Sequence, residues 1–172
     1  MEELVEKAKN RIDGAFDELI LLIEKEMYLI AKSRLKNDDD IADAIQETIL
    51  ICFKNIRKLK NNNFFKTWSI RILINECNKI YKKKKREMIS LDEKEIEITD
   101  ENYDDSNLSF QILIENLKEE EKTILTMYYC FQYTTKEISN ILNINENTVK
   151  SKIVRAKEKL KNKFGGEKTW KI

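Results

Sequence analysis

The sequence predicts an all-α protein with two small helical domains joined by an acidic flexible linker, the C-terminal domain being a helix-turn-helix. The chain of 172 residues has no proline and only 3 glycines, which favours long helices and short turns. Apolar residues recur at helical spacing in residues 16–88 and again in residues 108–164. Residues 89–107 lack this period and are rich in acidic side chains. We therefore expect domains at residues 10–88 and 108–165, with the linker at 89–107.

The composition argues against several classes of protein. The net charge is +1, so a surface that binds nucleic acid must be local. There is no histidine, and Cys52, Cys77 and Cys130 lie far apart, so we expect reduced thiols, no metal site and no cofactor. No glycine-rich phosphate loop or nucleophile motif is present, so neither an enzyme nor a small-molecule substrate is expected. No apolar run approaches the roughly 20 residues that span a bilayer, which predicts a cytoplasmic protein.

The first strongly periodic segment, residues 40–59, is predicted to be a helix with an unusual outer face. Its core stripe consists of Ile41, Ile45, Ile49, Cys52 and Ile56. The opposite face carries Asp43, Gln46, Glu47 and Leu50. If all four of these side chains were polar, the face would be interpreted as an ordinary solvated helix surface. The apolar Leu50 among these side chains favours a docking surface for a basic partner helix.

A second predicted helix, residues 64–86, combines an apolar stripe with an aromatic and basic face. The expected core side is formed by Ile70, Leu73, Ile74, Cys77, Ile80 and Tyr81. The other side presents Trp68, Arg71, Asn75, Asn78, Lys79, Lys82 and Arg86. Cations hold phosphates, aromatic rings stack on bases and amides bond to base edges, so this face is typical of nucleic-acid binding. The alternative is that Trp68 folds into the core and the lysines only improve solubility.

A polar loop precedes this second helix. It contains Asn61, Asn62 and Asn63 in succession. Amide side chains can both donate and accept hydrogen bonds, so such a loop could hold an unstacked base.

The C-terminal region has the cap and turn residues of a helix-turn-helix. Thr134 or Thr135 can cap the first helix, with Glu137 in its first turn. Asn143 tolerates a left-handed backbone in the turn, and Asn145 can cap the second helix. A supporting helix is expected at residues 117–133.

The second helix of this motif has the pattern of a recognition helix. Val149, Ile153, Ala156 and Leu160 form its inner stripe. Its outer side carries Asn147, Lys150, Ser151, Val154 and Arg155. Such side chains can reach base edges in the major groove. The expected phosphate contacts are Lys152, Lys157, Lys159, Lys161 and Lys163. The alternative is a generic helical hairpin with solvated lysines.

Three motifs, in this order and spacing, resemble those of bacterial sigma-70 family sigma factors of the extracytoplasmic-function (ECF) class. The segment that starts at Asp43 is similar to the D-x-x-Q-E-T motif of that family. The segment from Phe65 to Asn75 is similar to F-x-x-W-x-x-R-I-x-x-N, although Ser69 follows the tryptophan where leucine is frequent. Residues 119–155 are similar to the C-terminal DNA-binding domain of the family.

The resemblance implies a role for each candidate residue. It implies that the beta-prime clamp helices of core RNA polymerase bind Asp43, Gln46, Glu47 and Leu50. It implies that the −10 promoter element is melted and read by Asn61, Asn62, Asn63, Trp68, Arg71, Asn75, Lys79 and Lys82. It implies that the −35 element is read by Asn147, Lys150, Ser151, Val154 and Arg155. The acidic linker matches the segment that threads through polymerase toward the RNA exit channel.

The resemblance also implies partners and leaves two rival classes to consider. The expected partners are core polymerase, promoter DNA and an anti-sigma factor that is typically tethered to the membrane. One rival is a helix-turn-helix regulator that binds a two-fold duplex site alone. It has no use for the aromatic and basic face around Trp68. The other rival is an adaptor that docks a protein through Asp43, Glu47 and Leu50 without DNA.

Overall fold

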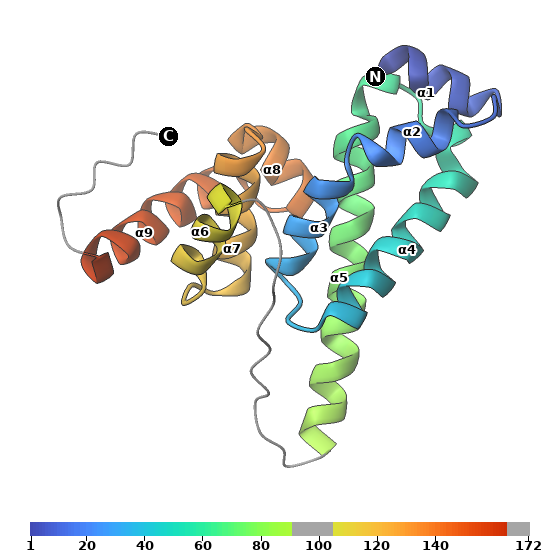
Figure 1. Cartoon of the computed structure of the whole chain (residues 1–172). Helices are drawn as coiled ribbons and strands as arrows, with labels where there is room; N and C mark the ends of the chain where they lie inside the picture. Colours follow the sequence, from blue (N-terminus) through green and yellow to red (C-terminus); the bar gives the residue numbers. More distant parts are fainter. Residues whose placement is uncertain (91–104, 165–172) are drawn as a thin grey trace. The chain divides into compact units, whose positions relative to one another are not determined.

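The computed structural model describes residues 1–90 and 105–164, and all regular structure within them is helical. The chain divides into two compact units, Met1–Ile98 and Thr99–Ile172. The prediction of an all-α fold is confirmed (Figure 1). Residues 91–104 of the predicted linker lie outside the described residues, as does the chain from residue 165. The flanking helices include residues 89–90 and 105–107, so regular structure enters both ends of the segment assigned to the linker.

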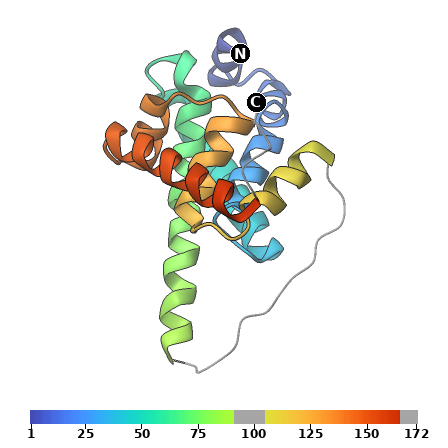
Figure 2. The same cartoon turned by 90° about the vertical axis from the view of Figure 1, so that its left-hand side faces the viewer.

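The first unit is built around two long helices. Its α-helices are α1 (Glu2–Lys9), α2 (Ala15–Leu21), α3 (Glu24–Lys32), α4 (Asp38–Asn55) and α5 (Phe65–Ser90). Two short 3-10 turns, η1 (Ile56–Lys58) and η2 (Asn62–Phe64), connect α4 to α5. This unit begins at Met1 and so includes α1, which the predicted range 10–88 leaves out. The last turns of α5 extend beyond the other helices of the unit (Figures 1 and 2).

Helical periodicity predicted most of the buried faces of α4 and α5. The predicted core residues that are buried are Ile41, Cys52, Ile56, Ile70, Leu73, Ile74 and Cys77. Ala44 and Thr48 complete the buried line of α4, whereas Ile45, Ile49 and Ile80 are only half-buried. The prediction for Tyr81 is wrong, since its side chain is 46% exposed. Residues 81–86 of α5 are all exposed, so the buried stripe of this helix ends before Tyr81.

Ser69, the departure from the family motif, has a packing role. Its side chain is fully buried and its hydroxyl donates to the Phe65 carbonyl at 2.8 Å. This bond within α5 satisfies the hydroxyl, which would otherwise be costly to bury. A small side chain here also allows close contact between α5 and the buried thiol of Cys52 on α4.

The second unit contains α6 (Asp105–Ile114), α7 (Glu119–Leu125), α8 (Thr135–Leu142) and α9 (Glu146–Phe164). The predicted helix at residues 117–133 begins later, at α7, and passes into a π-helical turn, η3 (Thr126–Cys130). Gln132 then takes a positive φ of 57° and reverses the chain toward α8. The core of this unit includes Ile114, Ile124, Leu125, Met127, Ile138, Ile141, Val149 and Ala156.

The predicted helix-turn-helix is confirmed, including its local chemistry. Thr134 caps α8: its hydroxyl accepts the N–H of Glu137 at 3.2 Å, and the Glu137 carboxylate accepts the Thr134 N–H at 2.8 Å. Asn143 has a left-handed backbone with φ 54°. The Asn145 side chain accepts the Asn147 N–H at 2.8 Å and so caps the start of α9. These groups fix the entry of the chain into α9.

Candidate functional site

The recognition helix α9 separates an inner from an outer side as the sequence predicted. Val149, Ile153, Ala156 and Leu160 are buried. Asn147, Lys150, Val154 and Arg155 are exposed. Ser151 is half-buried, and its hydroxyl donates within the helix to the Thr148 carbonyl at 3.0 Å. The outer side therefore offers an amide, a guanidinium and the apolar group of Val154, which together can contact base edges and a thymine methyl.

Glu146 joins the starts of the two helices of the motif. Its carboxylate accepts a hydrogen bond from the Thr135 hydroxyl at 2.8 Å and pairs with Lys150 at 2.9 Å. These two contacts, that of Lys150 first, hold the pKa of Glu146 below its usual value. The pair with Lys150 is solvent-exposed, so it contributes little and can open when a phosphate or base competes for the ammonium group.

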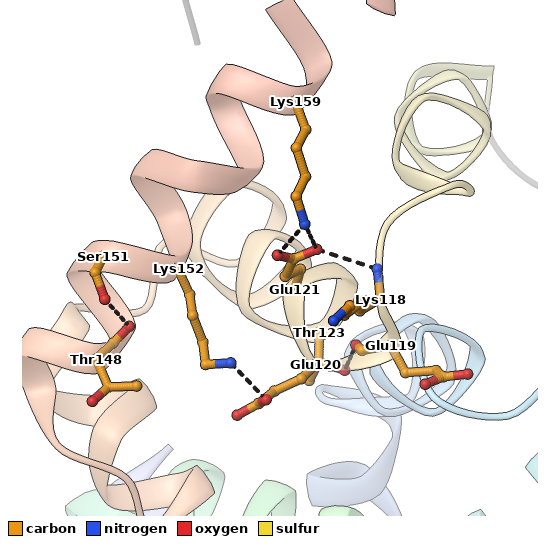
Figure 3. Close-up of polar contacts among 9 residues, drawn as sticks. All are labelled: Lys118, Glu119, Glu120, Glu121, Thr123, Thr148, Ser151, Lys152 and Lys159. Carbon is orange, nitrogen blue, oxygen red and sulfur yellow. Dashed lines mark hydrogen bonds and ion pairs between the residues drawn. The ribbon is translucent and has the colours of Figure 1, made fainter.

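Two lysines that the sequence assigned to phosphate contact are engaged inside the unit instead. Lys152 pairs with Glu120 at 2.7 Å, and Lys159 donates to both carboxylate oxygens of Glu121, at 2.6 and 2.9 Å (Figure 3). Both glutamates belong to the first turn of α7. These lysines therefore brace α9 on α7. Of the other predicted phosphate ligands, Lys157 and Lys161 are exposed.

In the first unit, the aromatic and basic face of α5 is formed only in part. Trp68 is half-buried, and its ring centroid lies 6.1 Å from that of the fully buried Phe65. The Trp68 side chain therefore packs against the core at Phe65 but remains partly accessible to solvent. Arg71 and Asn75, within the next two turns of α5, are exposed, and Lys82 is exposed further along the same helix. This arrangement leaves one side of the tryptophan available for stacking next to a cation and an amide.

Lys79 and Asn78, on the same face, have intramolecular partners. The Lys79 ammonium lies 2.8 Å from each carboxylate oxygen of Glu76, which is buried. Asn78 accepts a hydrogen bond from the Arg34 guanidinium at 2.6 Å and so joins α5 to the turn that follows α3. Lys79 compensates a buried carboxylate, so any contribution to phosphate binding competes with that role.

The three asparagines before α5 are not equivalent. Asn61 and Asn63 are exposed, and the Asn61 side chain accepts the Asn63 N–H at 3.0 Å, which caps η2. Asn62 is turned toward α1 and bonds to Lys9 and Glu6. Phe64 is 58% exposed at the end of the same turn. The sequence reasoning missed Phe64, although the adjacency of Phe64 and the buried Phe65 at a helix start means that both cannot point inward.

The outer face of α4 is exposed as predicted and extends further than predicted. Asp43, Gln46, Glu47 and Leu50 all face solvent, and Leu50 is 49% exposed. Phe53, three residues beyond Leu50, is also half exposed. Its ring meets the Phe16 ring edge-on at a centroid distance of 5.2 Å. The helical spacing from Leu50 could have identified Phe53. The face is thus a mixed acidic and apolar surface of the kind that binds a partner helix.

The two cysteines of the first unit are buried thiols of low reactivity. Cys52 and Cys77 are buried, and burial raises the pKa of the first to about 11 and of the second to about 12. Both are therefore neutral thiols at physiological pH. Within residues 1–90 and 105–164, no group of acidic, cysteine or histidine side chains is arranged to hold a metal ion. The same residues contain no helix long and apolar enough to span a membrane.

Comparison with known families gives two matches, one in each unit. A model of sigma-70 region 2 matches residues 21–87, and a model described as sigma-70, region 4 matches residues 108–160. The RNA polymerase sigma factor SigV of Bacillus subtilis is 28% identical over 137 residues, which cover 77% of this chain and 81% of that protein. The ECF RNA polymerase sigma-E factor of Haemophilus influenzae is 25% identical over 179 residues, which cover 95% and 94%.

Solved structures share the fold. The sigma factor RpoE from Bartonella quintana, determined with the anti-sigma factor NepR, aligns with a TM-score of 0.75 at 20% identity over 86% of this chain and 94% of that one. CnrH, determined with the cytosolic domain of CnrY, aligns with a TM-score of 0.68 at 16% identity over 94% of each chain. The two region matches, in the order that the sequence motifs predicted, together with these relatives show that the chain belongs to the sigma-70 family of RNA polymerase sigma factors, in its ECF class.

Proposed function

We propose that this protein is an alternative sigma factor that binds core RNA polymerase and directs initiation at promoters with a defined −10 and −35 element. The observation that supports the proposal is the presence of two separate units, each with a solvent-accessible face whose side chains suit nucleic-acid binding. One unit presents Trp68, Arg71 and Asn75, and the other presents Asn147 and Arg155. A sigma factor needs both faces, because it reads two promoter elements at once.

The first unit would both dock on polymerase and open the −10 element. The mixed face of α4 suits the beta-prime clamp helices, because Asp43 and Glu47 offer charge and Leu50 offers an apolar contact. Opening duplex DNA costs a few kcal/mol per unstacked step. Stacking on the exposed side of Trp68 and hydrogen bonds to Asn75 would offset that cost, with Arg71 and Lys82 holding the backbone.

The second unit would hold the duplex −35 element. Asn147, Val154 and Arg155 would meet base edges in the major groove, with Lys150 and Ser151 beside them. Since polymerase and the chromosome share the cytoplasm, the protein would act there. The neighbour RpoE, solved with the anti-sigma factor NepR, supports the further proposal that an anti-sigma factor, typically tethered to the membrane, covers these surfaces until a signal arrives. Polymerase performs the chemistry, so the protein itself would have no catalytic role.

Run-off transcription tests this function. Purified protein would be combined with bacterial core polymerase and a linear template that carries the promoter of its own operon. We expect a discrete transcript that depends on the protein and whose start site locates both promoter elements. A duplex footprint by the protein alone, with no transcript and no binding of core polymerase, would instead identify a stand-alone regulator.

A further inference from the structure

The first helix of the chain contacts the loop that leads into α5. Helix α1 is anchored by Val5 and Ala8, which are both buried. Its polar side faces η1 and η2, the two turns between α4 and α5. The match to sigma-70 region 2 begins only at residue 21, so α1 lies outside it. The α1 side of this contact therefore belongs to a part of the chain to which neither the motifs nor the family match assigns a role.

Lys9 and Asn62 form the centre of this contact. The Lys9 ammonium donates to the side-chain oxygen of Asn62 at 2.5 Å and to the backbone carbonyl of Leu59 at 2.6 Å. The amide nitrogen of Asn62 donates to the Glu6 carboxylate at 2.9 Å. The donor and the acceptor of one asparagine side chain are thus each used by a charged residue of α1. We name Glu6, Lys9 and Asn62 the α1 clamp.

A second hydrogen bond joins α1 to η1, at the start of the connection between α4 and α5. The Arg57 guanidinium in η1 donates to the Lys9 carbonyl at 2.9 Å. That carbonyl ends α1, where helix carbonyls lack partners within the helix and the dipole favours a cation. Arg57 in η1 and Asn62 in η2 are both bonded to α1. The residues between them therefore have little freedom to move relative to α1.

The α1 clamp orients the side chains of residues 61–64 relative to solvent. Because Asn62 is turned toward α1, its neighbours Asn61 and Asn63 face solvent, and Asn61 caps η2 by accepting the Asn63 N–H. Phe64 follows, also exposed, directly before α5. A site that is already ordered before binding avoids the entropy cost of ordering it on the ligand.

We propose that α1 is a positioning element for promoter recognition. Glu6, Lys9 and Asn62 hold η2 so that Asn61, Asn63 and Phe64 meet an unstacked base of the −10 element. This inference rests on the proposed function and deepens it. It also reassigns Asn62: this asparagine is a positioning residue whose side chain faces the protein, while its two neighbours face the DNA.

The test uses the full chain with core polymerase and a set of promoters that differ by single bases in the −10 element. Lys9→Met removes the two hydrogen bonds of the ammonium group, to the Asn62 side chain and to the Leu59 carbonyl, and keeps an unbranched side chain. We expect transcription from the preferred promoter to fall roughly tenfold, the effect of losing hydrogen bonds to a charged group. We expect the ratio between preferred and mismatched −10 sequences to fall with it, while affinity for core polymerase is unchanged.

Matched variants separate positioning from general effects. Lys7→Met removes an equal charge from α1, but Lys7 pairs with the exposed Glu3, so the −10 preference should not change. Lys9→Arg should restore much of the preference. Glu6→Gln with Asn62→Asp exchanges amide and carboxylate between the two positions, so this pair should recover what Asn62→Asp alone loses.

The outcomes are distinct. A drop that is equal across all −10 sequences, or an equal effect of Lys7→Met, would overturn the inference, because α1 would then serve only stability or charge. A wild-type protein that gives no transcript with core polymerase would refute the proposed function and the inference with it. A selective loss of −10 preference with Lys9→Met, rescued by Lys9→Arg, supports it.

Discussion

Lys159 on α9 donates two hydrogen bonds to the carboxylate of Glu121 on α7, at 2.6 and 2.9 Å (Figure 3). The carboxylate also accepts the backbone N–H of Lys118 at 3.3 Å. With Lys152 paired to Glu120, this contact fixes α9 on its support. The basic residues of α9 therefore divide into some that pair with α7, such as Lys152 and Lys159, and others, such as Arg155 and Lys157, that we propose contact DNA.

The Glu121 contact should make the second unit less stable in acid. Burial raises the pKa of this carboxyl, but the hydrogen bonds from Lys159 and Lys118 outweigh burial, so the pKa lies below its ordinary value of 4.5. A lowered folded-state pKa stabilises the fold above the unfolded value and loses that effect as the pH falls through the folded value. Glu121→Gln should lower the free energy of unfolding by about 1 kcal/mol at neutral pH and by less in acid.

Urea titration of the full chain, followed by NMR signals of α7 and α9, measures this difference. Glu120→Gln is the matched control, because Glu120 is 43% exposed and its pair with Lys152 should contribute little. An equal effect of the two variants, or an effect of Glu121→Gln that persists undiminished at pH 3, would contradict the assignment.

The outer face of α4 should carry the affinity for polymerase. Gln46→Lys with Glu47→Lys places two cations on a face proposed to meet a basic helix, so pull-down of core polymerase should be abolished. Asp17→Lys with Glu18→Gln on α2 changes the net charge by the same amount at exposed positions and should leave binding intact. Full binding by the α4 variant would place the docking surface elsewhere.

The helix-turn-helix was predictable from sequence because its determinants are local. Thr134 and Glu137 are three residues apart, and the left-handed Asn143 needs only its own side chain. The α1 clamp was not predictable, since Lys9 and Asn62 are separated by 53 positions. Lys159 and Glu121 are likewise 38 positions apart. Periodicity identified the stripe that contains Tyr81 but not the point along α5 at which that stripe stops being buried.

Asn143 offers a direct test of the turn. Its φ of 54° costs a side chain with a Cβ roughly 1–2 kcal/mol, which asparagine partly offsets by local hydrogen bonding. Asn143→Ala should therefore lower the free energy of unfolding of the second unit by about 1 kcal/mol, whereas Asn143→Gly should be neutral or stabilising. Thermal unfolding of the three proteins measures the order. Equal stability of the alanine and glycine variants would contradict the left-handed turn.

Arg155 is the residue of α9 best placed to read sequence. It is exposed on the outer side, next to the exposed Val154. An arginine in the major groove typically makes a bidentate contact with guanine that is worth about 1–3 kcal/mol of discrimination. Arg155→Ala should thus relax preference at one or two base pairs of the −35 element, measured by transcription from single-base promoter variants.

The matched comparison for Arg155 is Lys157→Ala, because Lys157 is an exposed cation on the same helix whose ammonium lies 5.1 Å from the centre of the Tyr129 ring. A residue that only holds phosphate weakens binding by the same factor on every sequence and reduces the salt dependence. The two variants should therefore differ in kind: Arg155→Ala should change the ranking of promoters, and Lys157→Ala should lower all of them together. If Arg155→Ala also lowered every promoter equally, Arg155 would be a phosphate contact, and base reading would fall to Asn147, Ser151 and Val154.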